Sequence, residues 1–586
     1  MDVSLDPSTE NDSLRLLRTN WKLVLLLVLG AIFYSRALTF GFVYDDAPQI
    51  LANARLQHLR DVPGYFTQHL WAHMLPPSEG NYYRPLFLVW LFANFSLFGA
   101  KAWAWHLTTV LVQLCTTFAV FRLAVRLTGN ERVALLTSAL FLVHPLAIQP
   151  TVWISDVDDS LCLLLMIGSF LLYLKARARR GYLFFSLSLL LFVAALLMKE
   201  TAVVVVPLVA AYELIFGSEG SKIARVRLAV RDALPFGLMF LGYFLVRSLV
   251  LGSALHAPVK ASWLSCLATL PSVLWLYTEN IFIPTRLALF YDLSYVTAAS
   301  WSLVWLPLLA VTIVGAAVAL LCSVGRSKPL FFGLLWVAIT MALPLATMPL
   351  LGNLGLVHDR YFYPAMPGMF LISALLLNLL IGDRKTLGWA LVALVIGSLA
   401  VLNWQQQGYW KSDETLFDRA FVVSPGAPKV RLQLAWRKMR AGNLQQANEL
   451  IESVLKKDGR DFDAYFARFV LREQIKDLSG AEADARKALE VRPNSPQAHA
   501  MIANALMLQG REAEGQTELR KAVDGFPTNI DYRLDLADSY RRQKNFSAAR
   551  EQYREATLLR PDDPVLRQYV AGFEREAAGR AGNPVP

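Results

Sequence analysis

Apolar runs of about 20 residues recur along the first 403 positions of this 586-residue chain, and they constrain the fold more than any other feature. A transmembrane helix needs about 20 consecutive, mostly apolar residues. Runs of about that length lie near 21–40, 103–125, 132–150, 157–175, 181–198, 202–216, 232–251, 301–322, 330–351, 361–381 and 387–403. The sequence therefore predicts an all-α, polytopic bundle of about 11 spans over residues 1–403.

Charged residues are distributed unevenly between this region and the rest of the chain. Residues 404–586 hold 55 of the 103 Lys, Arg, Asp and Glu residues, which makes them 30% charged, against 12% for residues 1–403. A soluble domain is about 25% charged, so we expect a water-soluble domain at 404–586 and exclude a purely soluble enzyme. Most of the net charge of +11 lies among the apolar runs. This position favours Lys and Arg of cytoplasmic loops, as the positive-inside rule expects, over a surface that binds nucleic acid.

Basic residues also predict the orientation of the spans, because Lys and Arg collect in short cytoplasmic loops. Five clusters fall on the side of the N-terminus: Arg122, Arg126 and Arg132; Lys175, Arg177, Arg179 and Arg180; Lys222, Arg225, Arg227 and Arg231; Arg326 and Lys328; Arg384 and Lys385. Residues 263–283 are long enough to cross, but a crossing there would invert everything that follows. We therefore expect a re-entrant or interfacial segment there.

Arg15, Arg18 and Lys22 precede or begin the first run, which we interpret as a retained first helix with the N-terminus in the cytoplasm. An odd number of crossings then places residues 404–586 outside the cytoplasm. The expected location is a bacterial inner membrane with a periplasmic C-terminal domain. An endoplasmic-reticulum membrane would satisfy the same physics.

Polar motifs gather in the loops that this orientation makes external. They are Asp45–Asp46, the YRPL stretch at 83–86, His144–Pro145 followed by ISDVDD, Lys199–Glu200, and DRYFYP at 359–364. Ionisable residues at membrane boundaries are costly and mark functional sites. A solvated loop charge or a helix cap explains any one of them, but several such loops on one face favour a shared site.

The soluble region carries a repeat of 34 residues. Pro493, Pro527 and Pro561 share this period, as do Gly442, Gly510 and Lys544, and a third series is Ala447, Ala481, Gly515 and Ala549. A 34-residue period with a small residue at the helix crossing is typical of the tetratricopeptide repeat, a stacked helix pair. We expect about four repeats in an α-solenoid that binds a protein partner; a mere spacer is the alternative.

Taken together in this order, these motifs resemble the transmembrane-and-TPR-containing O-mannosyltransferase-like proteins of the type C glycosyltransferase superfamily. The resemblance covers nearly the whole chain. It implies a lumenal or periplasmic active site that transfers a sugar from a polyprenyl-phosphate carrier to an acceptor, with inversion at the anomeric carbon. The domains are then 1–403, a transmembrane glycosyltransferase-like domain, and 404–586, an extracytoplasmic repeat domain that binds the acceptor protein.

The resemblance also assigns roles to residues. An attacking hydroxyl needs a carboxylate to take its proton, and by resemblance Asp45 is the base, while Asp46 orients the acceptor or helps to hold a divalent cation. The leaving lipid phosphate needs cations, for which Arg360 and Lys199 are the candidates, with Arg84 and His144 in the same pocket. Supporting positions are Glu200, Asp159 and Tyr361, and a Glu200–Lys199 ion pair would make that motif structural.

Two positions depart from the family pattern. Gln149 stands where the family commonly has Glu, and Val157 where an Arg precedes Asp159 by two residues. A neutral amide cannot act as a base at neutral pH. A second carboxylate role would therefore have to move to Asp156, Asp158 or Asp159, and the identity of the sugar stays open.

Two other functions compete with a protein glycosyltransferase. One is transfer of a lipid-linked glycan to a lipid or an envelope polysaccharide, against which the repeats argue because they usually bind polypeptide. The other is a non-enzymatic membrane scaffold for protein assembly, for which one span would suffice. Buried ionisable pairs in mid-span, as a transporter would need, are not part of the pattern.

Overall fold

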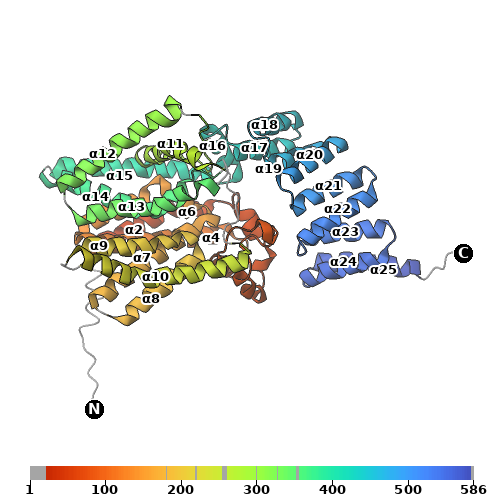
Figure 1. Ribbon diagram of the computed structural model, residues 1–586, viewed down its shortest axis with the longest axis horizontal. Helices are drawn as coiled ribbons and strands as arrows, with labels where there is room; N and C mark the ends of the chain where they lie inside the picture. The colour runs from red at the N-terminus through yellow and green to blue at the C-terminus, as the bar shows by residue number, and fades with distance from the viewer. Residues whose placement is uncertain are drawn as a thin grey trace, which may run out of the picture. The chain divides into compact units, whose positions relative to one another are not determined.

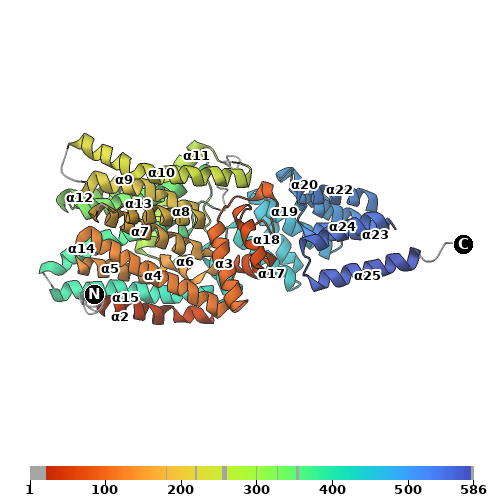
Figure 2. The same ribbon diagram turned by 90° about the horizontal axis from the view of Figure 1, so that it is seen from below.

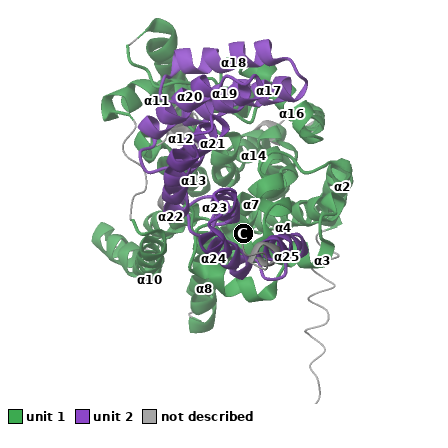
Figure 3. Cartoon of the chain, turned by 90° about the vertical axis from the view of Figure 1, so that its right-hand side faces the viewer, with its two compact units in different colours: residues 1–70, 81–427 green, residues 71–80, 428–586 purple. Residues whose placement is uncertain are grey.

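The computed structural model describes residues 21–179, 181–217, 221–253, 261–298, 300–325, 327–350, 355–383 and 385–581. Over these residues all regular structure is helical, as predicted, and they contain no strand. Five residues of the basic pattern, Arg15, Arg18, Arg180, Arg326 and Arg384, lie outside the described ranges. The chain forms two compact units, residues 1–70 with 81–427 and residues 71–80 with 428–586 (Figure 3).

Long helices that lie side by side build the first unit (Figures 1 and 2). Their bounds are α2 (Trp21–Tyr34), α3 (Pro85–Phe98), α4 (Ala102–Thr128), α5 (Glu131–Val143), α6 (Ile148–Val152), α7 (Val157–Arg179), α8 (Tyr182–Met198), α9 (Val205–Phe216), α10 (Lys222–Leu251), α11 (Trp263–Phe282), α12 (Leu306–Gly325), α13 (Lys328–Ala346), α14 (Met366–Asp383), α15 (Lys385–Gln407) and α16 (Asp413–Val423). The predicted boundary at 403/404 lies inside α15. Helix α16 stays with the first unit, where it buries Leu416, Phe417 and Ala420.

Fewer helices than predicted are long and apolar enough to cross a membrane. Within the described ranges seven segments qualify, and a bent pair makes up to eight. The seven are Trp21–Thr39, Ala102–Thr128, Ile154–Arg179, Lys222–Leu251, Lys328–Leu350, Asp359–Leu379 and Thr386–Trp410, and the pair is Glu131–Val143 with Pro145–Val152, bent by 63°. The structure therefore supports fewer long spans than the eleven expected.

The missing spans have local causes. The apolar helix Tyr182–Met198 is shorter than a full span. The expected span at 301–322 falls on the turn Trp301–Trp305 and on α12, which together run to Gly325 and have the length of a span. The expected span at 202–216 begins with a 3-10 turn, Glu200–Val204, so that α9 has only 12 residues. Helix α11 has the length of a span, but it contains Pro271 and Glu279 and is not among the seven. Its re-entrant or interfacial placement stays a prediction.

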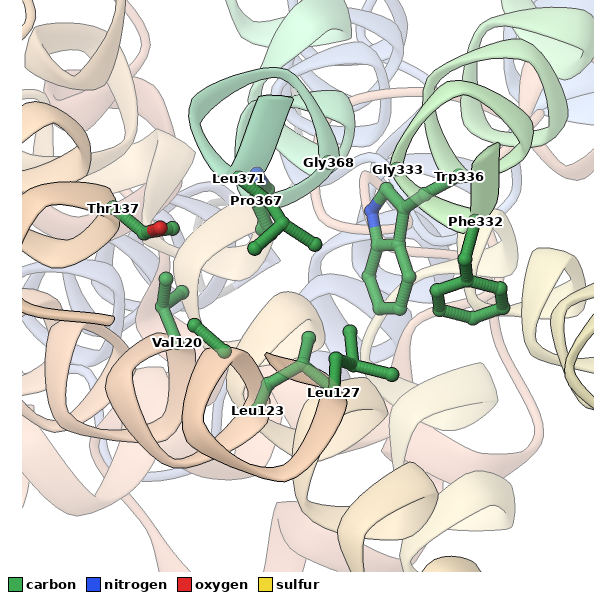
Figure 4. A pocket seen from close by; sticks show the side chains of 11 residues that line it. Val120, Leu123, Leu127, Thr137, Phe332, Gly333, Trp336, Pro367, Gly368 and Leu371 are labelled. Carbon is green, nitrogen blue, oxygen red and sulfur yellow. The ribbon is translucent and has the colours of Figure 1, made fainter. Parts of the chain in front are cut away.

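Small residues let the long helices approach closely. A Cβ atom on Gly368 of α14 would lie 2.7 Å from the carbonyl oxygen of Gly333 on α13, so only glycine fits there. Such contacts are typical of helix packing in membranes. Around this contact lies a small apolar pocket between α4, α5, α13 and α14 (Figure 4); Leu123, Phe332 and Trp336 line it, and Thr137 supplies its one hydroxyl group.

The second unit confirms the predicted repeats. Its helices pair in sequence: α17 (Pro428–Arg440) with α18 (Leu444–Lys457), α19 (Phe462–Gln474) with α20 (Leu478–Val491), α21 (Pro496–Leu508) with α22 (Glu512–Gly525), and α23 (Ile530–Arg542) with α24 (Phe546–Leu559), followed by α25 (Pro564–Ala581). The turn inside each pair contains one residue with positive φ. These residues are Gly442, Lys476, Gly510 and Lys544, at φ 77°, 62°, 80° and 64°. Residues 34 positions apart thus have the same left-handed backbone conformation, which ends the first helix of each pair.

Candidate active site

Helix breaks in the first unit carry most of the predicted site residues. Arg84 directly precedes Pro85, the first residue of α3, a position that favours proline. Helix α5 ends at Val143, and the following His144 is extended because it precedes Pro145. Lys199 is extended (φ −158°, ψ 134°) between α8 and a 3-10 turn. These polar residues therefore lie at helix ends and not along the helices, whose surfaces are mostly apolar.

Arg84 is the centre of a charged network. Its Nε and Nη2 atoms donate to the two oxygens of Glu200 at 3.0 and 2.7 Å, and its Nη1 atom donates to Asp158 at 2.7 Å. The Arg84 side chain is 12% exposed and that of Asp158 only 2%. Bidentate carboxylate pairs of this kind fix geometry as well as charge.

Lys199 extends the network to the start of α7. Its Nζ atom lies 2.6 Å from Asp159 and 3.4 Å from Asp158. The Lys199–Glu200 ion pair considered from the sequence is not formed, because Glu200 binds Arg84 instead. Lys199 is extended whereas Glu200 begins a 3-10 turn, and the two side chains reach different partners.

These contacts hold the charges of the network in place. Burial alone would raise the pKa of Glu200, but the Arg84 charge and its hydrogen bonds outweigh burial and hold that pKa at about 2. For Lys199, burial lowers the pKa, yet the Asp158 and Asp159 charges raise it above its ordinary value. For the pKa of Arg84, burial is likewise outweighed by Glu200 and Asp158. All three groups are therefore ionised at neutral pH.

Arg360 is the cation of the site with unused hydrogen-bonding capacity. Its Nε atom lies 3.5 Å from Asp156, and its guanidinium lies 5.2 Å from the ring centre of Trp153. The Nη1 atom of Arg360 and the Oδ2 atom of Asp156 are both buried without a hydrogen-bond partner among the described residues. Arg84 and Lys199 are neutralised by carboxylates, so Arg360 is the best placed of the predicted phosphate ligands.

The acidic pair divides into one anchored and one accessible residue. Asp46 is fully buried and accepts hydrogen bonds from the Val43 amide (2.9 Å) and from the Ser155 amide (2.8 Å) and hydroxyl (2.5 Å). Burial raises the pKa of Asp46 to about 7, against the opposing effect of these hydrogen bonds. Asp45 is half-buried.

Tyr44, which precedes the acidic pair, has an unusual backbone conformation. Its φ of 50° lies in the left-handed region, which bulky residues rarely adopt and which marks a position held by its surroundings. The Tyr44 ring contacts those of Trp153, Phe290 and Phe417 at 5.8–5.9 Å between centroids. This aromatic cluster also contacts Arg360 through Trp153, so that it links the acidic pair to the cation.

The DRYFYP motif contains a second anchored carboxylate, Asp359, whose partners are not evident from the sequence. Asp359 accepts hydrogen bonds from Tyr291 (2.6 Å), Asn280 (3.3 Å) and the side-chain amide of Gln149 (3.4 Å). The Gln149 oxygen accepts from the Arg360 amide at 3.3 Å. The neutral Gln149 amide can thus donate a hydrogen bond to the buried Asp359 carboxylate, which a second carboxylate could not do. The sequence signals for Tyr291 and Asn280 are only their polar type within an apolar region.

Two predicted residues take other positions. His144 is not brought to the charged network: Nδ1 of its buried ring accepts from the Leu146 amide, Nε2 lies 3.0 Å from the Ile281 carbonyl oxygen, and the ring packs on Phe370. This arrangement is a helix-end cap. Tyr361 lies next to Arg360, with 5.6 Å between its ring centre and the guanidinium.

A divalent cation has one candidate position among the described residues. Ligand oxygens of Asp156, Asp158 and Asp159 lie within 4.8 Å of one another, and carboxylates are the ligands that hard cations prefer. The fit is partial, because Asp158 and Asp159 already pair with Arg84 and Lys199. For the Asp45–Asp46 pair considered from the sequence, both oxygens of Asp46 already accept hydrogen bonds.

Known proteins match both parts of the chain. A family model described as "Dolichyl-phosphate-mannose-protein mannosyltransferase" matches residues 83–247, and one described as "Tetratricopeptide repeat" matches residues 432–499 and 500–564. The chain is 23% identical to mouse protein O-mannosyl-transferase TMTC3, with 93% of this chain and 60% of that protein covered. It is 31% identical to Drosophila melanogaster protein O-mannosyl-transferase Tmtc2 over 217 residues, which are 35% of this chain and 23% of that protein.

Among solved structures, a thermophilic TPR protein of Thermus thermophilus, TTC0263, is 24% identical, with 32% of this chain and 95% of that chain covered and a TM-score of 0.24. The chain spans 60% or less of the length of these curated relatives. It contains a segment of the mannosyltransferase type followed by tetratricopeptide repeats, and it is homologous over most of its length to the TMTC protein O-mannosyl-transferases.

Proposed function

We propose that this chain is a membrane glycosyltransferase that moves a sugar from a polyprenyl-phosphate carrier to a hydroxyl group of an acceptor protein, with inversion. The observation that supports this most is that five separate segments of the first unit meet around residues 153–159: the loop of Asp45–Asp46, through Tyr44 and Asp46, together with Arg360 and the Arg84–Lys199 network. The relatives, named protein O-mannosyl-transferases, support the same reaction class.

In the proposed reaction the acceptor oxygen bonds to the anomeric carbon as the bond from that carbon to the phosphate oxygen breaks. Asp45 takes the hydroxyl proton, for which its partial exposure suits it. Negative charge grows on the leaving phosphate, and Arg360 donates to it through its unused Nη1 atom. A single displacement of this kind inverts the anomeric centre. Arg84 and Lys199 fix the acidic residues around the leaving group.

The site and the repeats face the extracytoplasmic side of a bacterial inner membrane in this proposal, with the N-terminus in the cytoplasm. The support is the distribution of Lys and Arg, whose clusters at Arg122–Arg132 and Lys222–Arg231 follow alternate spans. Residues 1–403 then carry the chemistry. The repeats of 404–586 bind the acceptor polypeptide, the usual ligand of such solenoids.

Intact-mass spectrometry of envelope proteins tests the function. We would compare cells with the parent protein, without it, and with Asp45→Asn or Arg360→Ala, using Asp61→Asn as the matched carboxylate control in the same loop. We expect one protein to lose a hexose-sized mass in the deletion and both site variants, but not in the control. If properly folded Asp45→Asn and Arg360→Ala proteins glycosylated as fast as the parent, the site assignment would be wrong.

A further inference from the structure

Tyr82 presents a large aromatic ring at the surface, next to the charged network. It lies in the segment without regular structure that precedes α3, immediately before the YRPL stretch. Tyr82 is 42% exposed, whereas the following Tyr83 is only 2% exposed. The proposed transfer chemistry gives this ring no role, although an exposed aromatic side chain can contribute much to the binding of a ligand.

The backbone around Tyr82 is held on both sides. The Tyr82 carbonyl oxygen accepts a hydrogen bond from the Leu70 amide at 2.8 Å. The Tyr83 hydroxyl donates to the Phe66 carbonyl oxygen at 3.1 Å, and the Tyr83 carbonyl oxygen accepts from the Tyr243 hydroxyl at 3.2 Å. A ligand that packs on the Tyr82 ring would therefore have to order little of the protein around it.

The ring lies close to both cations of the proposed phosphate site. The Arg84 guanidinium lies 4.6 Å from the centre of the Tyr82 ring, while the hydrogen bonds of Arg84 go to the carboxylates of the network. The Tyr82 phenol also interacts electrostatically with Arg360 and Tyr361. Tyr82 is thus near Arg360, the residue proposed to bind the phosphate, as well as near Arg84.

Solvent reaches the network at this place. The side chains of Glu200 and Arg360 are partly exposed, as is the ring of Tyr82. In the proposed reaction the sugar is bonded to the phosphate that Arg360 binds, so the sugar ring must lie directly next to that phosphate. Tyr82 offers an accessible aromatic face in the same neighbourhood.

An aromatic ring suits one face of a sugar ring. The face of an aromatic ring carries negative partial charge and attracts the weakly positive hydrogens of C–H groups, which a pyranose presents on its faces. The contact also removes apolar area from water. The hydroxyl groups at the rim of the sugar stay free to bond to water or to polar side chains.

We propose that the Tyr82 ring packs on the sugar ring of the donor and so distinguishes the loaded carrier from the carrier phosphate alone. This inference rests on the proposed function. Because the contact exists only while the sugar is bonded to the phosphate, it favours binding of the substrate and is lost when the spent carrier leaves. Arg360, in contrast, binds the phosphate of both forms.

Equilibrium binding to the full chain in detergent tests this contact. The two probes are polyprenyl-phosphate mannose and the same polyprenyl phosphate without sugar. Tyr82→Leu should raise the Kd for the first probe about five- to tenfold, the effect of a lost aromatic contact, and leave the Kd for the second at the parent value. Tyr82→Phe keeps the ring and should bind both probes like the parent.

The matched control is Tyr182→Leu, which removes an exposed tyrosine ring from the first residue of α8. Lys199 follows the other end of that helix, and at about 1.5 Å per residue the two positions are roughly 25 Å apart. This variant should change neither Kd. A thermal midpoint close to that of the parent shows that each variant folds.

The proposal is overturned if Tyr82→Leu leaves the Kd for polyprenyl-phosphate mannose unchanged. It also fails if binding of both probes weakens equally, which would assign the ring to the carrier lipid, the phosphate or the support of Arg84. An equal loss in Tyr82→Phe and Tyr82→Leu would make the hydroxyl, and not the ring, the contact. Failure of the proposed function shows differently, as a parent that binds polyprenyl-phosphate mannose but transfers no sugar to protein.

Discussion

The guanidinium of Arg84 and the carboxylate of Glu200, 116 residues apart in sequence, form a bidentate ion pair with contacts of 3.0 and 2.7 Å. The pair joins the start of α3 to the break between α8 and α9, where the network also takes in Asp158 and Lys199. Two helix breaks that the sequence leaves unconnected are thereby held at one place.

Arg84→Gln should destabilise the protein by about 2–3 kcal/mol. Breaking a buried pair costs about 3–5 kcal/mol, and the 33% exposure of the Glu200 side chain reduces that figure through solvent screening. Denaturant unfolding in detergent micelles measures the change. The matched control is Arg231→Gln, which breaks a pair of the same 2.7 Å length whose Arg is 70% exposed and should cost at most about 1 kcal/mol. Equal losses in both variants would contradict a special role of the buried pair.

Asp46 should make stability fall as the pH rises. Its pKa is about 7 in the folded protein and about 3.8 when unfolded. The folded state thus holds more protons between these values, and the contribution of Asp46 to stability is full below about pH 4 and is lost as the pH rises through 7. Asp46→Asn, which mimics the protonated form, should remove this dependence. Thermal unfolding midpoints at pH 5 and pH 8 measure it.

The control for Asp46 is Asp61→Asn in the same external loop, which should keep the pH dependence of the parent. If the midpoints of the parent and of Asp46→Asn changed in parallel between pH 5 and pH 8, the buried carboxylate would not be the titrating group.

Gln149→Glu should lower both stability and transfer activity, because it places a second carboxylate about 3–4 Å from that of Asp359. Uncompensated like charges in a buried site are strongly unfavourable. We expect the transfer rate to fall at least tenfold. Adding Asp359→Asn to Gln149→Glu should restore part of the lost stability, since it removes one of the two charges. A double-variant cycle of thermal midpoints checks this, and additive losses would show that the two side chains do not interact.

Much of the fold could be predicted because apolar periodicity and the 34-residue repeat are local properties of the sequence. Lys476 illustrates the remaining gap: it takes the left-handed position of the second helix pair, where glycine stands in the first and third. The expected span at 202–216 is shorter in the structure, because residues 200–204 form a 3-10 turn and shorten α9, which composition does not reveal.

The site was predictable as a set of motifs but not as a set of contacts. Glu200 stands beside Lys199 in the sequence, yet it pairs with Arg84, which lies 116 residues away. Asp359 depends on Tyr291 and Asn280, which lie 68 and 79 residues away. Such distant partners are brought together by the packing of helices, which no local pattern encodes.

The repeat unit has a buried ion-pair cluster that should dominate the stability of its second helix pair. Asp484 of α20 accepts from Arg468 of α19 at 2.7 Å and pairs with Arg472 at 2.9 Å, and the Asp484 side chain is only 2% exposed. Asp484→Ala leaves both guanidinium groups without this partner, which should cost about 3 kcal/mol. Hydrogen exchange of the α19 and α20 amides in the full chain measures that loss as faster exchange.

The matched control is Glu490→Ala on the same helix, which removes the partner of Lys487 in a pair that is also 2.7 Å long. Both side chains of that pair are more than half exposed (54% and 63%), so solvent screens the pair and its loss should leave the stability close to that of the parent. Exchange should therefore be faster in Asp484→Ala by roughly a factor of 100, which corresponds to about 3 kcal/mol, and should stay close to the parent rate in Glu490→Ala. Similar protection in Asp484→Ala and Glu490→Ala would mean that apolar packing around Ala481 and Ala485, rather than the buried carboxylate, determines the stability of this pair.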